Sequence, residues 1–495
     1  MSSCLLCTCL TATTTEQCLA QMSAAAEKSD LFEIRLDYNE QPDLGRLLED
    51  PPKPVIATNR PEREGGRYKG NENNRIAVLK EASELGADYI DIELDSVSLL
   101  GDIGRSKLIV SYHNFDETPD DLDSIHKQIV ESGADIAKLA TLARDISDNE
   151  RMFRLLLRSQ VPTIGLCMGE LGLISRILAP RYGSVLTFAA VGEGRESAPG
   201  QLTADELTCL YGLRRIDRDT EIYGVIGNPI GHSMSPHIHN AAFQQLDMNR
   251  VYVPFLVDEV TEFLASFKDL GVMGCSVTIP HKETCMESLD EVDPIARRIG
   301  AVNTIAHQNG KLYGCNTDWR AAVDSIEEEL QRREEGENPL REKQVALIGA
   351  GGAARAIGFG IVERGGELLI VNRTEERARR LAEELECASM PLKNFLESDV
   401  NADVIINSSS VGMSPNDQQT PVPKTLLKPK MVVFDAVYNP IRTRLIREAE
   451  EVGCPTITGF EMFVRQAAAQ FELWTEMDAP RELMASVVRQ RLEGV

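Results

Sequence analysis

About 210 residues at the start of the chain alternate between short apolar runs and helical patterns, and this alternation restricts the fold more than any other feature. Helical segments such as EQCLAQMSAAAEK and NRIAVLKEASELG separate the apolar runs. Strands that alternate with helices form parallel sheets, and eight such units can close into a (β/α)8 barrel. We therefore predict an α/β protein that begins with a (β/α)8 barrel over residues 1–213. The eight runs are SCLLCTCL, LFEIRLDY, PVIATNR, YIDIEL, KLIVSYHNF, DIAKLAT, PTIGLCMG and SVLTFAAV.

Charged and polar residues lie at the ends of these runs, except for Lys138, which lies inside the sixth. Barrels build their active sites at the carboxyl ends of the strands, whereas an ordinary surface would carry such charges on the helices. The sequence therefore predicts a site at the barrel mouth. The candidate residues are Glu33, Arg35, Asp37, Arg60, Glu93 and His113 at strand ends and Arg176 in the loop after the seventh run.

Lys138 is flanked by apolar residues, and a buried lysine is rare unless it is paired or functional. Removal from water disfavours the ammonium form, so we expect burial to free the amine for attack on a ketone. His113, in the neighbouring run, is the candidate for moving the adjacent proton. The alternative is a structural lysine whose ammonium reaches water at the barrel mouth. The two residues together favour Schiff-base chemistry.

A short charged connector at 214–221 leads to a second α/β region, for which we predict a small domain over residues 222–335. The runs YGVIG, RVYVPFLV and CSVTIP predict strands, while SPHIHNAAFQQL and VTEFLASFKDL predict helices. Asn309-Gly310 is a strong turn signal, so AVNTIAHQNGKLYGCNT predicts a hairpin. The polar segment DWRAAVDSIEEELQRREEGEN predicts a solvated helix and linker.

The segment QVALIGAGGAARAI predicts a strand, a glycine turn and the start of a helix, which opens a Rossmann domain over residues 340–458. Gly349, Gly351 and Gly352 would let the backbone approach a pyrophosphate at the helix N-terminus. The next strand ends at Asn372 with Arg373 where NAD-binding proteins usually carry an acidic residue, so NADP is favoured. The alternative is a purely structural glycine turn.

The motifs FEIRLDY, TNRPEREGG, SYHNF, DIAKLA, ISR and SAPGQ resemble those of type I 3-dehydroquinate dehydratases over nearly all of residues 4–213. The resemblance implies that Lys138 forms an imine with the ketone of 3-dehydroquinate. It implies that His113 removes the proton beside the imine and later protonates the departing hydroxyl, while Glu64 orients His113 and balances its charge. The residues implied to hold the carboxylate and hydroxyls of the substrate are Glu33, Arg35, Arg60, Arg176, Ser197 and Gln201.

The motifs GNPIGHSMSP, SVTIPHKE, GAVNT, GCNTD, GAGGAAR, FDAVYNP and GFEMFVRQA resemble those of shikimate dehydrogenases over residues 222–490. This resemblance implies that Lys282 and Asp318 are the catalytic pair at the ketone or alcohol. His281 occupies a position that some relatives fill with an aromatic residue. The residues implied to bind the substrate are Ser233, Ser235, Thr278, Asn303, Tyr438 and Gln466.

The same resemblance implies an NADP(H) site in the glycine turn and at the end of the following strand. It also implies that helices in 459–495 pack back on the substrate domain. Arg373, Thr374 and Arg377 would hold the phosphate of the adenosine. The other residues implied to contact the cofactor are Gly349, Ala350, Gly351, Gly352, Ala353 and Asn372 in the turn and strand end, with Gly459 and Met462 against the nicotinamide.

Composition excludes some classes of partner. The chain of 495 residues has a net charge of -25, which argues against binding to nucleic acid or to an anionic membrane. Cys4, Cys7 and Cys9 lack the further ligands of a zinc site, so we expect no metal and eleven reduced cysteines. The first basic residue is Lys28, so we expect no signal or transit peptide and favour the cytoplasm; a plastid requires that a transit peptide has been removed.

The two resemblances share a metabolite, because 3-dehydroshikimate is the product of the first reaction and the substrate of the second. The order of the halves resembles the plant-type bifunctional dehydratase–dehydrogenases. We therefore expect dehydration of 3-dehydroquinate followed by reduction to shikimate with NADPH. Two alternatives remain open: a quinate dehydrogenase in the second half, and a catalytically silent scaffold or metabolite sensor.

Overall fold

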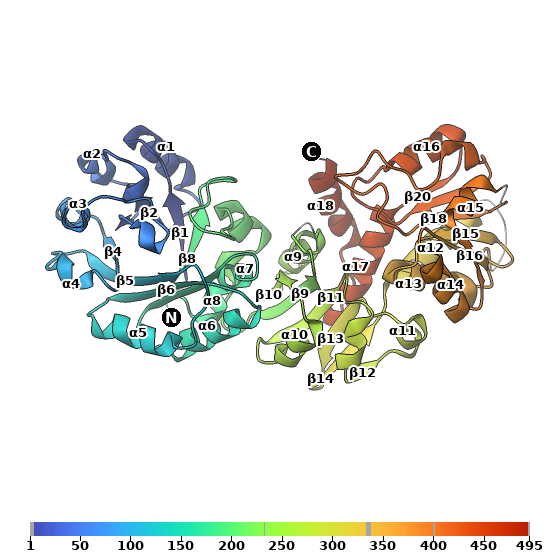
Figure 1. Ribbon diagram of the computed structural model, residues 1–495, viewed down its shortest axis with the longest axis horizontal. Helices are drawn as coiled ribbons and strands as arrows, with labels where there is room; N and C mark the ends of the chain where they lie inside the picture. Colours follow the sequence, from blue (N-terminus) through green and yellow to red (C-terminus); the bar gives the residue numbers. More distant parts are fainter. Residues whose placement is uncertain (1–3, 232, 333–337, 399–400, 494–495) are drawn as a thin grey trace. The chain divides into compact units, whose positions relative to one another are not determined.

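The computed structural model describes residues 4–231, 233–332, 338–398 and 401–493 (Figure 1). His232 of the motif GNPIGHSMSP and residues 333–337 of the predicted solvated helix and linker lie outside the described residues. The chain divides into two compact units, one of residues up to 223 together with 247–271, and the other of residues 224–246 together with 272 to the end.

The first unit holds an eight-stranded parallel sheet that is nearly closed into a barrel, as predicted (Figure 1). The strands follow the order β7-β6-β5-β4-β3-β2-β1-β8, and each neighbouring pair is parallel. The two ends of this order meet where Val185 N donates to Thr163 O at 3.0 Å. The strands are β1 (Leu5–Leu10), β2 (Leu31–Arg35), β3 (Val55–Thr58), β4 (Tyr89–Glu93), β5 (Lys107–Asn114), β6 (Ile136–Leu142), β7 (Thr163–Met168) and β8 (Leu186–Ala190).

Helices cover the outside of this barrel, and apolar strand residues such as Leu31, Ile109 and Ile164 form a core cluster within it (Figure 1). The sixth helix shows why the chain folds this way, because its apolar residues recur on one face and Met152 and Phe153 are buried there. The helices are α1 (Thr15–Ala25), α2 (Leu44–Leu48), α3 (Glu72–Glu84), α4 (Val97–Leu100), α5 (Leu122–Glu131), α6 (Ser147–Arg158), α7 (Leu173–Ile177) and α8 (Ala179–Tyr182).

A second, six-stranded sheet follows the order β10-β9-β11-β13-β14-β12. The predicted hairpin is present, because β13 and β14 pair antiparallel around Asn309 and Gly310, which both have positive φ. The strands are β9 (Glu221–Gly227), β10 (Arg250–Leu256), β11 (Val272–Val277), β12 (Glu291–Val292), β13 (Thr304–Gln308) and β14 (Lys311–Cys315). The helices are α9 (Ser235–Gln245), α10 (Val260–Ser266), α11 (Pro294–Ile299) and α12 (Asp318–Gln331).

The third sheet is parallel and doubly wound, with the order β17-β16-β15-β18-β19-β20. The strand order reverses between β15 and β18, and ligands bind at such reversals, beyond the carboxyl ends of the strands. This is the predicted Rossmann arrangement. Its elements are β15 (Gln344–Ile348), α13 (Gly352–Glu363), β16 (Glu367–Asn372), α14 (Glu375–Glu384), β17 (Ala388–Pro391), α15 (Leu392–Glu397), β18 (Val404–Asn407), β19 (Val432–Asp435), α16 (Arg444–Val452) and β20 (Thr456–Thr458).

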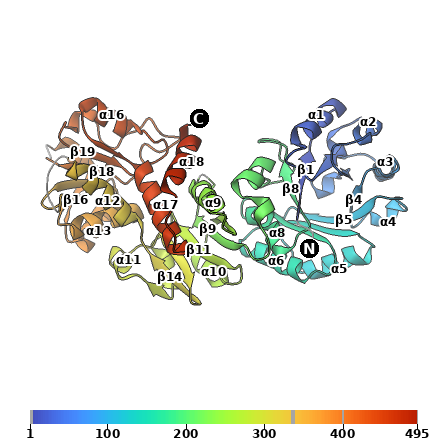
Figure 2. The same cartoon turned by 180° about the vertical axis from the view of Figure 1, so that it is seen from behind.

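The last two helices, α17 (Gly459–Thr475) and α18 (Arg481–Glu493), return to the second sheet and lie beside α9 (Figure 2). Trp474 Nε1 donates to Ile305 O at 3.0 Å, which fixes the end of α17 against β13. As a result, α17 runs from the end of β20 in the third sheet to the second sheet, and it borders the space between these two sheets.

No helix among the described residues is both long and apolar enough to cross a membrane. Within the same residues, no group of three or more His, Cys, Asp or Glu side chains is arranged to hold a metal ion.

Candidate active sites

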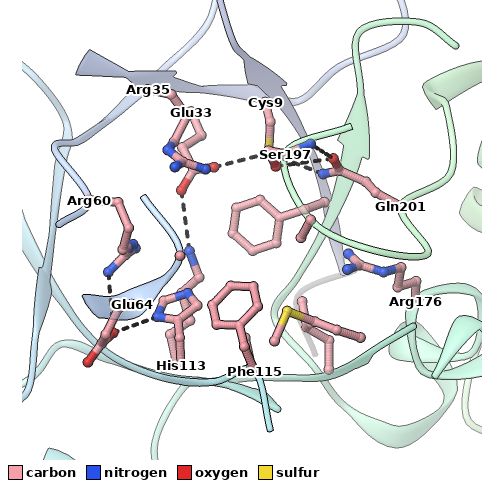
Figure 3. Close-up of a pocket in the computed structure, with 17 residues that line it drawn as sticks. Cys9, Glu33, Arg35, Arg60, Glu64, His113, Phe115, Arg176, Ser197 and Gln201 are labelled. Atoms are coloured by element: carbon pink, nitrogen blue, oxygen red, sulfur yellow. Dashed lines mark hydrogen bonds and ion pairs between the residues drawn. The ribbon is translucent and has the colours of Figure 1, made fainter. Parts of the chain in front are cut away.

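Nine of the eleven side chains predicted for the first site line one cavity at the carboxyl ends of the barrel strands, whereas Asp37 and Glu93 do not line it (Figure 3). Strand register brings them together, because Glu93 on β4 is level with Ser111 on β5, which is level with Lys138 on β6. Figure 3 shows Arg176 across the cavity from Arg60. The nine are Glu33, Arg35, Arg60, Glu64, His113, Lys138, Arg176, Ser197 and Gln201.

Lys138 is buried and ion-paired. Its Nζ lies 2.7 Å from Asp91 Oδ2 and 3.3 Å from Glu33 Oε1, and 4.3 Å from the centre of the Phe188 ring. Burial lowers the pKa of Lys138, but the carboxylates of Asp91 and Glu33 outweigh burial, and the net shift is upward. The structure thus differs from the sequence-based expectation of a freed amine, since the resting lysine is a paired ammonium whose proton must first leave.

His113 and Glu64 form a second pair beside this lysine. His113 Nδ1 lies 2.9 Å from Glu64 Oε2. Burial, with the nearby cations Arg60 and Lys138, lowers the pKa of His113 well below its usual value. Burial also raises the pKa of Glu64 to about 8. The imidazole is therefore neutral, and Glu64, once it ionises above that pKa, holds the proton on Nδ1 and leaves Nε2 free to act as a base.

Arg60 links the two pairs. Its guanidinium donates to Asp91 Oδ1 at 2.7 Å and to Glu93 Oε1 at 2.6 Å, and it lies 3.9 Å from Glu64. Burial raises the pKa of Asp91, but the charges of Arg60 and Lys138 lower it by more than burial raises it. This carboxylate therefore stays ionised. Asp91 was not predicted as a site residue, although the acidic residues at alternate positions of the apolar run YIDIEL were a usable signal.

The opposite side of the cavity suits a carboxylate. Arg176 is 1% exposed, burial lowers its pKa to about 10, and its Nε forms no hydrogen bond with any described residue. The Ser197 Oγ donates to Gln201 Oε1 at 3.1 Å, and the Gln201 amide donates to the Cys9 thiol at 3.3 Å. Arg35 is held by Asp37 at 2.7 Å. One buried arginine therefore faces the cavity with unused donors.

A second cavity, of about 180 Å³, gathers the residues predicted for the second site. Lys282 Nζ donates to Asp318 Oδ2 at 2.6 Å, and Asp318 begins α12, where the helix dipole favours a carboxylate. Asn303 Oδ1 accepts from Thr317 N at 2.8 Å, which fixes the residue before Asp318. The predicted residues that line this cavity are Ser233, Ser235, Thr278, Lys282, Asn303, Asp318, Ala353, Tyr438, Gly459, Met462 and Gln466.

Six further residues of this cavity were not predicted, and three of them, Ser276, Phe463 and Gln470, carry polar or aromatic side chains. Ser276 Oγ donates to Gln470 Oε1 at 2.8 Å. Phe463 stacks on Tyr438 with 4.5 Å between ring centres, and burial raises the pKa of Tyr438. Gln470 lies one helical turn after Gln466 on α17, so the spacing in RQAAAQ would have placed both amides on one helix face.

The glycine turn before α13 fits a dinucleotide phosphate. Gly349 has φ of 125°, and a Cβ there would lie 2.5 Å from Ser408 Oγ, so only glycine fits. The backbone then enters α13 at Gly352, beside Ala350, Gly351 and Ala353, with N–H groups available to an anion.

The end of β16 carries two exposed arginines. Arg373, Thr374 and Arg377 are exposed, and in the described part of the chain neither guanidinium forms a hydrogen bond or ion pair. Asn372 Nδ2 donates to Thr374 O at 3.0 Å, which orders the turn. These two arginines therefore fit an additional phosphate on the ribose better than they fit a bare hydroxyl.

Models of known families match both halves of the chain. Residues 6–218 match type I 3-dehydroquinase. The second half matches the shikimate dehydrogenase substrate binding domain over 225–305, shikimate / quinate 5-dehydrogenase over 329–435, and the shikimate 5'-dehydrogenase C-terminal domain over 459–489.

Solved structures resemble the second half. A shikimate dehydrogenase in complex with NADP+ is 38% identical with a TM-score of 0.52, and the match covers 56% of this chain and 97% of that one. A quinate dehydrogenase from Corynebacterium glutamicum in complex with NAD is 26% identical with a TM-score of 0.50, over 54% of this chain and 98% of that one.

Curated relatives match the second half alone or nearly the whole chain. A shikimate dehydrogenase (NADP(+)) of Bacillus cereus is 42% identical over 55% of this chain and 99% of its own length. A bifunctional 3-dehydroquinate dehydratase/shikimate dehydrogenase, chloroplastic, of Arabidopsis thaliana is 46% identical over 97% of this chain and 83% of its own length. The chain therefore belongs to the family of bifunctional 3-dehydroquinate dehydratase/shikimate dehydrogenases.

Proposed function

We propose that this chain catalyses two consecutive steps, the dehydration of 3-dehydroquinate to 3-dehydroshikimate and the NADPH-dependent reduction of that product to shikimate. The observation that carries the proposal is the buried Lys138 beside the His113–Glu64 pair in one cavity, in a chain whose second half holds the Lys282–Asp318 pair beside a dinucleotide turn.

In the first site, Lys138 loses its ammonium proton to water and the free amine attacks the substrate ketone; loss of water then leaves an iminium. His113 takes the proton from the carbon beside the iminium, with Glu64 stabilising the resulting imidazolium. The same proton is then returned to the departing hydroxyl, which leaves as water. Hydrolysis of the iminium releases 3-dehydroshikimate and restores the amine. Arg176 holds the substrate carboxylate throughout.

In the second site, Lys282 donates a hydrogen bond to the ketone oxygen and delivers the proton that completes the alcohol. Asp318 orients Lys282 and binds a substrate hydroxyl. The residues proposed to hold the cofactor are those of the glycine turn together with Arg373, Thr374 and Arg377, with Gly459 and Met462 beside the nicotinamide. NADPH supplies the hydride when it is bound there.

Substrate assays test the second half of the proposal. The alternative substrate is quinate, and the likeness to a quinate dehydrogenase is the observation that favours testing it. We expect the purified chain to oxidise shikimate with NADP+ faster than quinate with either cofactor. Faster turnover of quinate would show that quinate is the substrate of the second site. If neither substrate is turned over, the second half is a catalytically silent scaffold or sensor.

We further propose the domain limits 1–213 for the barrel, 214–221 for the linker, 222–335 with 459–495 for the substrate domain and 340–458 for the NADP domain. The sheet membership of the strands supports these limits. For the compartment we propose the cytoplasm, with a plastid as the alternative that the name of the Arabidopsis relative suggests. A fluorescent fusion of the protein in its own cells separates the two.

A further inference from the structure

Arg75 lies on an outer helix of the barrel, and its side chain ends inside the barrel wall. It lies on α3, its exposed fraction is 0%, and it was not predicted as a site residue. The guanidinium pairs with Glu72 at 2.6 Å on its own helix and donates to Asn59 O at 2.8 Å. Burying an arginine completely is costly unless its charge is balanced nearby. Its principal partner deeper in the barrel is Glu93. Arg75 Nη1 lies 2.6 Å from Glu93 Oε2, which makes an ion pair, although the two atoms are not aligned for a hydrogen bond.

The ion pairs continue without a gap from Arg75 to the reactive amine. Glu93 also accepts from Arg60 at 2.6 Å, and Arg60 donates to Asp91 at 2.7 Å. Asp91 in turn accepts from Lys138 at 2.7 Å. Positive and negative groups therefore alternate along one buried path, in which every member has an oppositely charged neighbour on each side.

The positive and negative charges along this path are equal in number only if Arg75 is counted. Three buried carboxylates, those of Glu33, Asp91 and Glu93, face three buried cations, those of Lys138, Arg60 and Arg75. Without Arg75, one carboxylate would be in excess next to a lysine that must lose its proton to react. Among the described residues, the other titratable or charged groups that face Lys138 or line the same cavity are Cys7, Cys9, Arg35 with its partner Asp37, Glu64, His113 and Arg176.

We propose that Arg75 is a positioning residue for the dehydratase, which holds Glu93 and balances its charge so that Arg60 stays on Asp91 and Lys138 can become a free amine. Arg75 itself does not line the cavity and acts only through Glu93 and Arg60. The proposal rests on the dehydratase function proposed above. A purely structural role is the alternative, in which Arg75 only ties α3 to the barrel.

The test uses the full-length chain and its dehydration of 3-dehydroquinate between pH 6 and pH 9. In Arg75→Met we expect the rate of dehydration near pH 7 to fall about tenfold, the effect of a change of about 1.4 kcal/mol between the two protonation states of the amine. The loss should shrink as the pH rises, because hydroxide then removes the proton that the surplus carboxylate retains. The same trend is expected in the amount of substrate trapped on Lys138 by borohydride.

Three further variants make the result specific. Arg63→Met is the matched control, because Arg63 also contacts Glu72, at 3.5 Å, but is partly exposed and pairs with Asp95 rather than Glu93. Its pH profile should stay that of the unmodified chain. Arg75→Lys keeps the charge and should keep the profile even if its rate falls. The double variant Arg75→Met with Glu93→Gln removes one charge of each sign, and the new amide oxygen can still accept from Arg60, so the pH profile should return.

The outcomes distinguish the positioning role of Arg75 from the dehydratase function on which it rests. An equal loss at every pH in Arg75→Met, or a profile that the double variant does not restore, contradicts the positioning role. If Arg75→Met does not fold, a shifted pH profile in Arg75→Lys contradicts it as well. If the unmodified chain does not dehydrate 3-dehydroquinate at all, the proposed function fails instead.

Discussion

At the scale of single residues, the first site places an ammonium, a neutral imidazole and a carboxyl within one buried group of charges. The pKa shifts of Lys138, His113 and Glu64 arise from burial and from the charges of neighbouring side chains. No residue has its reactive form because of its own type alone. The chemistry follows from the neighbours that the strand register supplies.

Covalent trapping tests Lys138. We expect borohydride added with 3-dehydroquinate to leave a mass adduct on the peptide that contains Lys138, because reduction makes the imine permanent. Lys138→Ala should abolish dehydration and leave shikimate oxidation near normal. An adduct on another peptide, or full dehydration by the alanine variant, would show that a different group forms the imine.

The pH profile tests Glu64. Only the ionised carboxylate holds the proton on His113 Nδ1 and leaves Nε2 as the base, and burial raises the pKa of Glu64 to about 8. The ionised fraction therefore grows as the pH rises through that value, so we expect the dehydration rate to rise from pH 6 to pH 9. Glu64→Gln should lower the rate at least tenfold and remove that rise. A rise that persists in Glu64→Gln would assign the titration to another group.

At the scale of elements, strand ends and helix starts carry nearly all of the chemistry. The eight barrel strands and the glycine turn could be predicted because period and turn residues are local properties of the sequence. The upward pKa shift of Lys138 could not, because the carboxylates reach Lys138 from β2 and β4, and no local pattern records which strands become neighbours. For the same reason the path from Arg75 to Lys138 is visible only in the fold.

We expect the end of β16 to determine the cofactor preference. Arg373 supplies a charge that NAD has no phosphate to meet, so we expect NADP to be preferred at least tenfold, about 1.4 kcal/mol. Arg373→Ala should narrow that preference chiefly through the KM for NADP. Arg379→Ala is the matched control, because Arg379 lies on the adjacent α14 but is paired with Glu376 at 2.8 Å. Equal use of NAD and NADP by the unmodified chain would falsify this assignment.

At the scale of the whole molecule, the two sets of functional side chains do not overlap along the chain. The first cavity is lined by residues up to Gln201 and the second from Val225 onward. We therefore expect a cut within 214–221 to give two proteins that each keep their own reaction. The barrel half should be less stable to heat, because it loses the hydrogen bond of 2.7 Å from Tyr182 Oη to Leu270 O. Inactivity of both separated halves would show that the sites depend on each other.

The central claim is that one chain carries out both steps in sequence, and a coupled assay tests it most directly. The purified protein is given 3-dehydroquinate and NADPH, and the loss of NADPH absorbance and the formation of shikimate are followed together. We predict that shikimate forms mole for mole with the NADPH consumed, and that Lys138→Ala and Lys282→Ala each stop the sequence while an equal mixture of the two variants restores it. Consumption of NADPH without shikimate, or a mixture that stays inactive while each variant retains its own intact half-reaction, would contradict the account.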